Sequence, residues 1–285
     1  MNKVMITGAY GQLGRELQIL YPDAVCIDRD IFDLTDWSQF QNYNWDDFDL
    51  ILNAAAYTNV DGAETDQGRR DAWAANATAV RNLAKVAAQH NITLVHISSE
   101  YVFDGETEVH DENEPLAPLG VYAQTKAAAE EIVSVLGKYY ILRTSWLIGP
   151  GKNFVRTMAD LAQKGVKPKV VNDQIGRLTF VDELSRAIKH LVDVKADSGT
   201  YNLTGDGESV GWDEIAAEVF ELVGKSRDDV TGISTEEYFA NAEAKISPRP
   251  HFSTLNLDKI KATGFKPKDW RESLKEYIKK LQEEK

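Results

Sequence analysis

A tyrosine and a lysine stand four residues apart in the segment Tyr122-Ala123-Gln124-Thr125-Lys126. On a helix, residues at i and i+4 lie on one face, so the phenol and the ammonium point the same way. Reduction of a ketone needs a proton on oxygen, and a nearby cation lowers the pKa of a phenol from about 10. We therefore predict Tyr122 as proton donor and Lys126 as the group that lowers its pKa while binding the cofactor ribose. Such a pair is common on helices, so it needs support from other residues.

A hydroxyl group is expected beside this pair. Ser99 follows the apolar run Thr93 to Ser98, which we predict to be a strand. In open parallel sheets, catalytic groups gather at the carboxyl ends of strands. The Ser99 hydroxyl can there hydrogen-bond a substrate oxygen. A serine in this position is more often a turn residue. The catalytic prediction for Ser99 therefore depends on the presence of Tyr122, Lys126 and a cofactor loop in the same chain.

Three glycines near the N-terminus have the spacing of a phosphate-binding loop. They follow an apolar run and precede a helical pattern, which is the context that such a loop requires. Gly8 permits a tight turn, Gly11 lets backbone amides approach a pyrophosphate, and Gly14 lets the helix pack closely on the strand. The helix N-terminus then faces the anion. The predicted dinucleotide contacts of this loop are Gly8, Tyr10, Gly11, Gln12, Leu13 and Gly14.

Two further strand ends supply candidate cofactor contacts. Asp28 lies about 20 positions after the first glycine of the loop, where a carboxylate binds ribose hydroxyls and favours NADH. Arg29 can instead pair with the 2′-phosphate of NADPH, or lie solvated on the surface, so the sequence allows NADPH or NADH. After another strand, small side chains leave room for a flat cofactor against the backbone. These residues are Ala54, Ala55 and Ala56.

These groups need a fold that brings several strand ends together. Short apolar runs alternate with helical periodicity, which predicts an α/β fold with a doubly wound parallel sheet of the Rossmann type. After about Gly149, glycines and prolines separate shorter elements. We predict a dinucleotide-binding domain over 1–150 that carries the catalytic residues, and a mainly substrate-binding region over 151–285 with some segments returning to the first core. The expected strands are 3–7, 24–28, 50–53, 93–98 and 139–143, and the expected helices are 11–20, 68–89, 122–136, 153–164, 180–194, 212–223 and 270–282.

Composition excludes several classes of function. The net charge of -13, without a run of Lys or Arg, argues against nucleic acid or an anionic membrane as partner. Neither a signal peptide nor an apolar run of membrane-spanning length is present, which predicts a cytoplasmic protein. The five histidines lack the paired spacing of a zinc site, so we expect no catalytic zinc. His96, inside an apolar run, is predicted to be a core or strand-end histidine.

Together these motifs resemble the dTDP-4-dehydrorhamnose reductases, a family of extended short-chain dehydrogenases. The resemblance covers nearly the whole chain and implies NAD(P)H-dependent reduction of the C4 ketone of dTDP-6-deoxy-L-lyxo-4-hexulose to dTDP-L-rhamnose. It implies the hydroxyl role for Ser99, often Thr in the family, and the proton donor and modulator roles for Tyr122 and Lys126. The motifs are Gly8-x-x-Gly11-x-x-Gly14, Asn53-Ala-Ala-Ala56, Ser98-Ser99-Glu100-Tyr101-Val102-Phe103, Tyr122-x-x-x-Lys126, Arg143-Thr144-Ser145-Trp146 and Asn172-Asp173-Gln174-x-Gly176.

The resemblance also implies further ligand contacts. By this analogy Asp33 and Leu34 flank the adenine, although a turn aspartate and a core leucine explain them equally well. The diphosphate of a dTDP-sugar needs local positive charge, for which Arg249 and Lys152 are the candidates. Some family members hold magnesium at a dimer interface, which makes Mg and a homodimer open questions with Glu16 and Asp182 as the matching acids. The predicted substrate contacts are Ser99, Glu100, Tyr101, Trp146, Asn153, Asn172, Gln174 and Arg249, with Asp173 on the same side.

Two departures from the family and two rival functions stay open. Glu100 replaces the usual Asp and Leu178 the usual Pro, which puts the loop geometry around the sugar, and so the substrate, in question. A different nucleotide-sugar ketoreductase, an epimerase or a dehydratase has the same fold. Dehydratases place two adjacent acids after the hydroxyl residue, whereas Tyr101 follows Glu100 here. A non-catalytic dinucleotide-binding regulatory subunit is the rival from another class.

Overall fold

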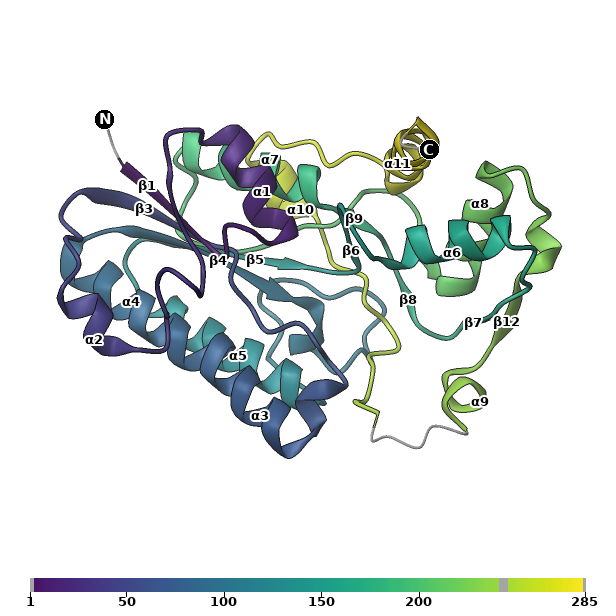
Figure 1. Ribbon diagram of the computed structural model, residues 1–285, viewed down its shortest axis with the longest axis horizontal. Helices are drawn as coiled ribbons and strands as arrows, with labels where there is room; N and C mark the ends of the chain where they lie inside the picture. Colours follow the sequence, from purple (N-terminus) through teal and green to yellow (C-terminus); the bar gives the residue numbers. More distant parts are fainter. Residues whose placement is uncertain (1–2, 241–245, 284–285) are drawn as a thin grey trace.

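A computed structural model describes residues 3–240 and 246–283 of the protein. Its centre is a six-stranded parallel sheet in the order β10-β5-β4-β3-β1-β2, seen in Figure 1 at the left of the molecule. The predicted doubly wound α/β fold is thereby confirmed. The strands are β1 (Lys3–Thr7), β2 (Val25–Ile27), β3 (Phe48–Asn53), β4 (Thr93–Ser99), β5 (Tyr139–Thr144) and β10 (Gly199–Asn202).

Helices cover both faces of this sheet, and this is why its inner strands are apolar along most of their length. On one face α1 and α7 pack against each other, with α10 beside them (Figure 1). On the other face α4 and α5 pack together, with α2 at one end and α3 at the other (Figure 1). The helices are α1 (Gln12–Leu20), α2 (Trp37–Gln41), α3 (Asp66–Trp73), α4 (Ala79–His90), α5 (Val121–Ser134), α7 (Val181–Asp193) and α10 (Asp258–Ala262).

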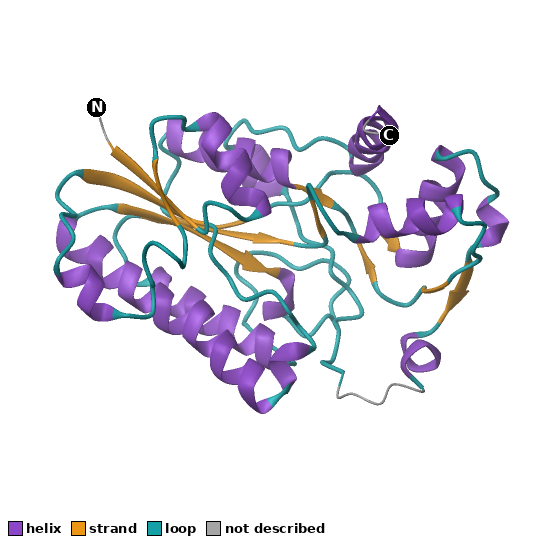
Figure 2. Ribbon diagram, viewed as in Figure 1, coloured by secondary structure: helices purple, strands orange, loops and turns teal. Residues whose placement is uncertain are grey.

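The remaining elements surround a separate apolar core beyond the carboxyl ends of the strands (Figure 2). Ile148, Val155, Ile215 and Trp270 are buried together there. Three two-stranded pairs, β11-β8, β12-β7 and β6-β9, frame this part. Its elements are β6 (Leu147–Ile148), α6 (Phe154–Gln163), β7 (Lys169–Val171), β8 (Ile175–Gly176), β9 (Thr179–Phe180), β11 (Val210–Gly211), α8 (Trp212–Leu222), β12 (Thr231–Ile233), α9 (Thr235–Phe239) and α11 (Trp270–Glu283). We call this part the cap.

The chain passes between the two cores more than once. After the first cap segments, α7 returns to pack on α1, and β10 pairs with β5 at the sheet edge. Residues 199–202 were not among the predicted strands, because a four-residue strand bounded by Gly199 has too weak a pattern. The division at residue 150 therefore describes sequence order better than space, and two independent domains remain a prediction.

One predicted helix has an interruption. The segment expected as a single helix over 68–89 is α3 and α4 joined by a π-helical turn at Ala74–Thr78. Such turns occur frequently at functional sites because the extra residue re-aims side chains. Among the residues that the structure describes, no helix is both long and apolar enough to cross a membrane.

Candidate active site

The glycine loop brings the backbone after β1 against the backbone after β3. Gly8 has φ of +63°, and a Cβ there would lie 2.6 Å from the backbone nitrogen of Ala55. Gly14, on the first turn of α1, packs against the carbonyl oxygen of Gly8 and the backbone of Ala9 so closely that no side chain fits. Both positions therefore need glycine for the close approach that the spacing predicted.

A cavity of about 510 Å³ opens at the carboxyl ends of β1, β2 and β3. This is the point where strand order reverses in the sheet, since β2 and β3 lie on opposite sides of β1. Open α/β sheets bind their ligands at such a point, and the volume lies within the usual range for a small ligand. The lining includes nine predicted cofactor residues, namely Gly8, Gly11, Asp28, Arg29, Asp33, Leu34, Ala54, Ala55 and Ala56.

The other predicted cofactor residues lie outside that lining. Gln12 and Leu13 begin α1, where the first backbone amides have no partner within the helix and can face an anion. The Leu13 side chain is buried in the sheet core, and Tyr10 is half exposed. Tyr122 and Lys126 also lie beyond the cavity. Tyr57, which lines it, packs in one apolar cluster with Tyr122 and connects the two places.

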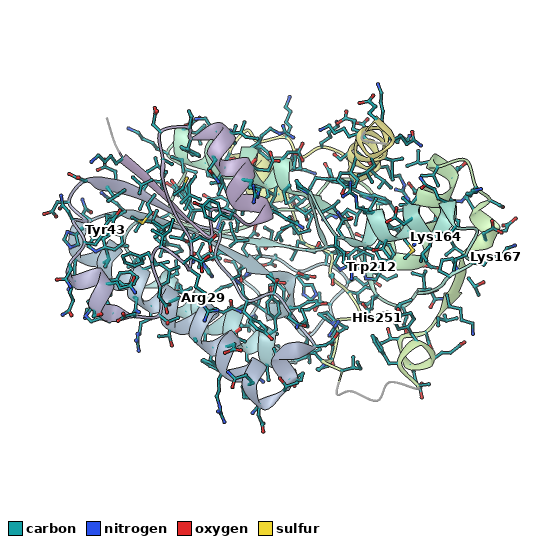
Figure 3. All side chains as sticks on the ribbon, viewed as in Figure 1. Arg29, Tyr43, Lys164, Lys167, Trp212 and His251 are labelled. Carbon is teal, nitrogen blue, oxygen red and sulfur yellow. The ribbon has the colours of Figure 1, made fainter. Side chains whose placement is uncertain are left out.

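Asp28 is fixed at the end of β2 by two backbone donors. Its Oδ2 accepts from the amide of Tyr10 at 3.0 Å, and its Oδ1 accepts from the amide of Arg29 at 2.7 Å. This carboxylate therefore joins the glycine loop to the second strand at the edge of the cavity. Arg29 is the neighbouring cation on the lining, and Figure 3 shows it on the sheet side of the molecule.

Ser99 and Tyr122 meet at the carboxyl end of β4. Ser99 is the last residue of that strand and Tyr122 lies in the first turn of α5, and the Ser99 side chain acts on the Tyr122 phenol. Ser99 Oγ also donates to Glu100 Oε2 at 2.7 Å and accepts from the amide of Tyr101 at 3.3 Å. The Tyr101 ring meets the Tyr122 ring edge-on, with centroids 5.9 Å apart. The structure thus joins residues predicted from two separate motifs.

Burial sets the proton affinities of this group. The pKa of Tyr122 is raised well above its ordinary value, mainly by desolvation and then by the Glu100 carboxylate, against a lowering by the hydrogen bond with Ser99. Desolvation also raises the pKa of Glu100 from 4.5 to about 7, while hydrogen bonds from Ser99, Ser253 and backbone amides lower it. Lys126 is not among the groups that set the pKa of Tyr122 in this structure, so its role as modulator remains a prediction.

The physical reason is the direction of the lysine side chain. Lys126 Nζ donates to the carbonyl oxygen of Ile97 at 2.5 Å and lies 3.5 Å from Nε2 of His96, so it points across β4. Desolvation lowers the pKa of Lys126 to about 8, and the Glu130 carboxylate acts against this. The spacing on the helix therefore predicts that Tyr122 and Lys126 share a face. It does not predict where the amine of the longer Lys126 side chain lies.

Sequence reasoning missed Asn76, which lies in the π-helical turn and is buried. Its Nδ2 donates to Thr125 Oγ1 and to the carbonyl of Tyr57, and its Oδ1 accepts from the Tyr57 amide. It therefore ties the loop after β3 to α5, one residue before Lys126. The unused signal was a polar asparagine within an otherwise apolar helical face.

Arg249 lies next to Tyr101 and is already paired. Its guanidinium donates to both carboxylate oxygens of Asp61 and to the carbonyl oxygen of Ser247, and it lies 6.0 Å from the Tyr101 ring centre. Sequence analysis did not single out Asp61. A positive group therefore lies beside Tyr101, with its charge partly compensated by this carboxylate.

Trp146 has a backbone strained for so large a residue, with φ of +45°. Its ring stacks on Trp212 with centroids 3.9 Å apart, and a Cβ at Gly176 would lie 2.9 Å from it. Gly176 belongs to the motif quoted above, so the structure explains the glycine by contact with the tryptophan. Trp212 was predicted only as the start of a helix, and Figure 3 shows it on the cap side, away from Arg29.

Several predicted substrate residues are engaged in bonds within the cap. Asn153 caps α6 through Arg156, and its Nδ2 donates to Gly149 and Tyr277. Asp173 accepts from the amide and hydroxyl of Thr235, and Gln174 donates to the same hydroxyl. The backbone of Asn172 pairs with Ile233. The structure thus gives these residues parts in holding the cap together and does not place them beside Tyr122, so their substrate role remains a prediction.

Glu16 and Asp182 come together from α1 and α7. The pKa of Glu16 is raised by partial burial and by the charge of Asp182. Both residues line a cavity of about 360 Å³ with Arg156 and Lys280. Among residues 3–240 and 246–283, no group of three or more metal-ligating side chains is assembled. Two carboxylates beside a lysine do not by themselves define a magnesium site.

The protein has a doubly wound parallel sheet with a glycine loop at the point where the strand order reverses. It also has Ser99, Tyr122 and Lys126 at the same edge of that sheet. This combination defines a nicotinamide-dependent oxidoreductase of the short-chain dehydrogenase type. Residues 1–283 match the family model described as RmlD substrate binding domain, and the chain belongs to that family. It is 36% identical to dTDP-4-dehydrorhamnose reductase of Aggregatibacter actinomycetemcomitans, over 96% of this chain and 98% of that one.

Two further comparisons agree with this assignment. The chain is 32% identical to the spore coat polysaccharide biosynthesis protein SpsK of Bacillus subtilis, over 98% of this chain and 97% of that one. The crystal structure of Bacillus anthracis dTDP-4-dehydrorhamnose reductase in complex with NADP matches with a TM-score of 0.87 and 35% identity, over 98% of this chain and 99% of that one. The family predicted from the motifs is therefore confirmed.

Proposed function

We propose that the protein reduces the C4 ketone of dTDP-6-deoxy-L-lyxo-4-hexulose to dTDP-L-rhamnose, a precursor for cell-surface polysaccharide. The observation that carries the proposal is the meeting of Ser99 and Tyr122 at the end of β4, next to the cavity in which we propose that the dinucleotide binds. The names of the relatives, a dTDP-4-dehydrorhamnose reductase and a spore coat polysaccharide protein, support the substrate and its use.

In this proposal the phenol of Tyr122 is the proton donor. A nicotinamide cofactor bound in the cavity supplies the hydride that C4 of the sugar accepts. The raised pKa of Tyr122 keeps its proton in place at neutral pH, which is the state that reduction requires. The phenol then gives that proton to the ketone oxygen as the C=O bond is reduced, and the Lys126 amine stabilises the phenolate that remains.

Glu100 controls the direction of the Ser99 hydrogen bond. With Glu100 ionised, Ser99 Oγ donates to its carboxylate and has no proton left for a substrate oxygen. A protonated Glu100 can donate to Ser99 instead, which frees the serine proton for the ketone. Since the pKa of Glu100 is about 7, both forms are populated near neutral pH.

We propose that both NADPH and NADH bind, with Asp28 on the ribose hydroxyls and Arg29 on the 2′-phosphate. The position of both side chains on the cavity lining supports this, as does the NADP complex of the Bacillus anthracis relative. Magnesium dependence, a homodimer and a cytoplasmic location remain predictions. The rival regulatory function would be favoured if one of the predicted catalytic residues were missing. Ser99, Tyr122 and Lys126 are all present.

The test is oxidation of NADPH and of NADH at 340 nm with dTDP-6-deoxy-L-lyxo-4-hexulose as substrate. Tyr122→Phe is the control, because it keeps the ring and removes the proton, and we expect it to lower kcat at least about 100-fold with dinucleotide binding unchanged. Rapid oxidation that persists in this variant would remove Tyr122 from the mechanism. Dinucleotide binding without turnover by the wild type would favour another keto-sugar or the regulatory function.

A further inference from the structure

Four buried polar side chains form a row beneath the active site. Thr7 and Asn53 are the last residues of β1 and β3, and His96 lies opposite Asn53 in the middle of β4. Lys126 reaches this row from α5. All four are buried, with His96 only 1% exposed. Buried polar groups need partners, so the direction of each hydrogen bond in this row is constrained.

The amide of Asn53 is oriented by the backbone. The N–H of Ala55 donates to Asn53 Oδ1 at 3.2 Å, and the hydroxyl of Thr7 donates to the same oxygen at 2.6 Å. Because a backbone N–H can only donate, the atom that it contacts must be the amide oxygen. The Nδ2 group of Asn53 therefore faces Nδ1 of His96, at 3.0 Å.

This orientation fixes the histidine tautomer. An amide NH₂ has no lone pair to offer, so Nδ1 of His96 must accept, and the single ring proton of the neutral imidazole lies on Nε2. Burial and the nearby Lys126 hold the pKa of His96 well below its usual value, so the ring stays neutral. The Nε2–H then points at Lys126 Nζ, 3.5 Å away.

An ammonium that faces an N–H meets another donor. Lys126 therefore gains nothing from a proton aimed at His96 and directs its own donation to the carbonyl of Ile97. The carboxylate that acts on the charge of Lys126 is Glu130, which is paired with Arg143 from β5.

We propose that His96 is a positioning residue that holds the amine of Lys126 in place through the tautomer set by Asn53. The opposed donor disfavours the ammonium and favours the neutral amine, whose lone pair can accept from Nε2–H. The row also connects the cofactor side to Lys126, because Ala55 lines the cavity and orients Asn53. The consequence for turnover rests on the proposed function, whereas the tautomer and the lysine titration do not.

Two substitutions of one residue separate this role from a packing role. In His96→Asn the side-chain oxygen can still accept from Asn53, but the group that faces Lys126 is lost. In His96→Gln the longer amide can present an N–H near the position of Nε2. A packing role predicts lower stability in both variants with no change in the lysine titration.

The first measurement is NMR titration of Lys126, with lysine labelled by ¹³C at Cε and Lys126→Arg used for assignment. We expect titration near pH 8 in the wild type, a rise of about one pH unit in His96→Asn and little change in His96→Gln. The same upward shift should appear in the pH profile of kcat. An unchanged Lys126 titration in folded His96→Asn would overturn the proposal, even if the protein is an active reductase.

The second measurement needs no variant. The ¹⁵N shifts of His96 in the wild type should show a neutral ring with its proton on Nε2 between pH 6 and about 9. A proton on Nδ1, or an imidazolium in that range, would overturn the proposal whether or not His96→Asn folds. A wild type that reduces no keto-sugar, but shows the expected tautomer and lysine shift, would refute the proposed function and leave this inference intact.

Discussion

The cavity at the ends of β1, β2 and β3 is lined by residues that all lie between Gly8 and Ala79. The residues predicted to face the sugar extend from Ser99 to Arg249 and come from the sheet, the cap and the segments that join them. The cavity, where we propose that the cofactor binds, uses backbone geometry and small side chains. The region predicted to face the sugar depends on large polar and aromatic side chains. Short motifs therefore predict the first region well, because a turn and a helix start are local. The second depends on partners far away in the chain.

The largest effect should follow from one methyl group on the cofactor side. In Gly8→Ala the new Cβ would lie 2.6 Å from a backbone nitrogen at a φ of +63°, and no side chain can move to relieve it. We expect dinucleotide affinity to fall at least about 100-fold, measured by calorimetry or fluorescence. Gly137→Ala is the matched control, since no atom of the residues that the structure describes lies within 4 Å of a Cβ there. Equal binding by both variants would show that backbone approach does not define this region.

The second prediction concerns Glu100, which accepts a hydrogen bond from Ser99 and is one of the residues predicted to face the sugar. Its pKa is raised from 4.5 to about 7, so its contribution to folding stability is full below pH 4.5 and is lost as pH rises through 7. Over that range this amounts to about 3 kcal/mol, and Glu100→Gln should remove it. Urea unfolding at pH 4.5 and 8 measures the difference.

Asp213 in the cap is the matched control for that experiment. Desolvation raises its pKa as well, but this residue is only partly buried. Asp213→Asn should therefore remove a smaller part of the pH dependence. Equal changes in the pH dependence of stability for both substitutions would show that the deeper burial of Glu100 does not give it a larger effect than Asp213 in the cap.

The third prediction tests whether Arg249 serves the sugar. Arg249→Met should raise KM for the dTDP-sugar about 10-fold and leave dinucleotide affinity unchanged, because the guanidinium lies beside Tyr101 and outside the cavity lining. Asp61→Asn should act in the opposite direction by releasing the charge of Arg249. Arg227→Met, in the cap, controls for loss of one positive charge. If KM were unchanged in all three variants, the role of Arg249 would be to hold its loop through the bonds to Asp61 and Ser247, without contact to the sugar nucleotide.

The smallest effect should follow from Arg29→Ala. Its guanidinium contributes to binding only when a 2′-phosphate is present, so KM for NADPH should rise about 5-fold while KM for NADH stays constant. The two cofactors measured on one variant are each other's control. Equal changes in the KM for NADPH and for NADH would mean that Arg29 contacts a group that both cofactors share. Binding in the cavity would then depend on this side chain as well as on backbone geometry.

Much of the fold and part of the site followed from local features of the sequence. Alternating periodicities predicted five strands of the sheet and most of its helices, and the glycine spacing predicted the loop. The strand β10 was missed because its four residues join the sheet by pairing with β5 and not through their own pattern. Asn76 and Asp61 were missed because their roles depend on Thr125 and Arg249, which are remote in sequence.

The sequence by itself determined where strands end and which residue types gather there, because backbone hydrogen bonding and helical spacing act over a few residues. Tertiary structure alone decided the partners of long polar side chains. It turned Lys126 toward Ile97 and His96 and engaged Asn153 and Gln174 within the cap. It also raised the pKa of Tyr122 by removing water from around the phenol. The physical reason is that burial, charge and hydrogen-bond supply depend on which elements pack together.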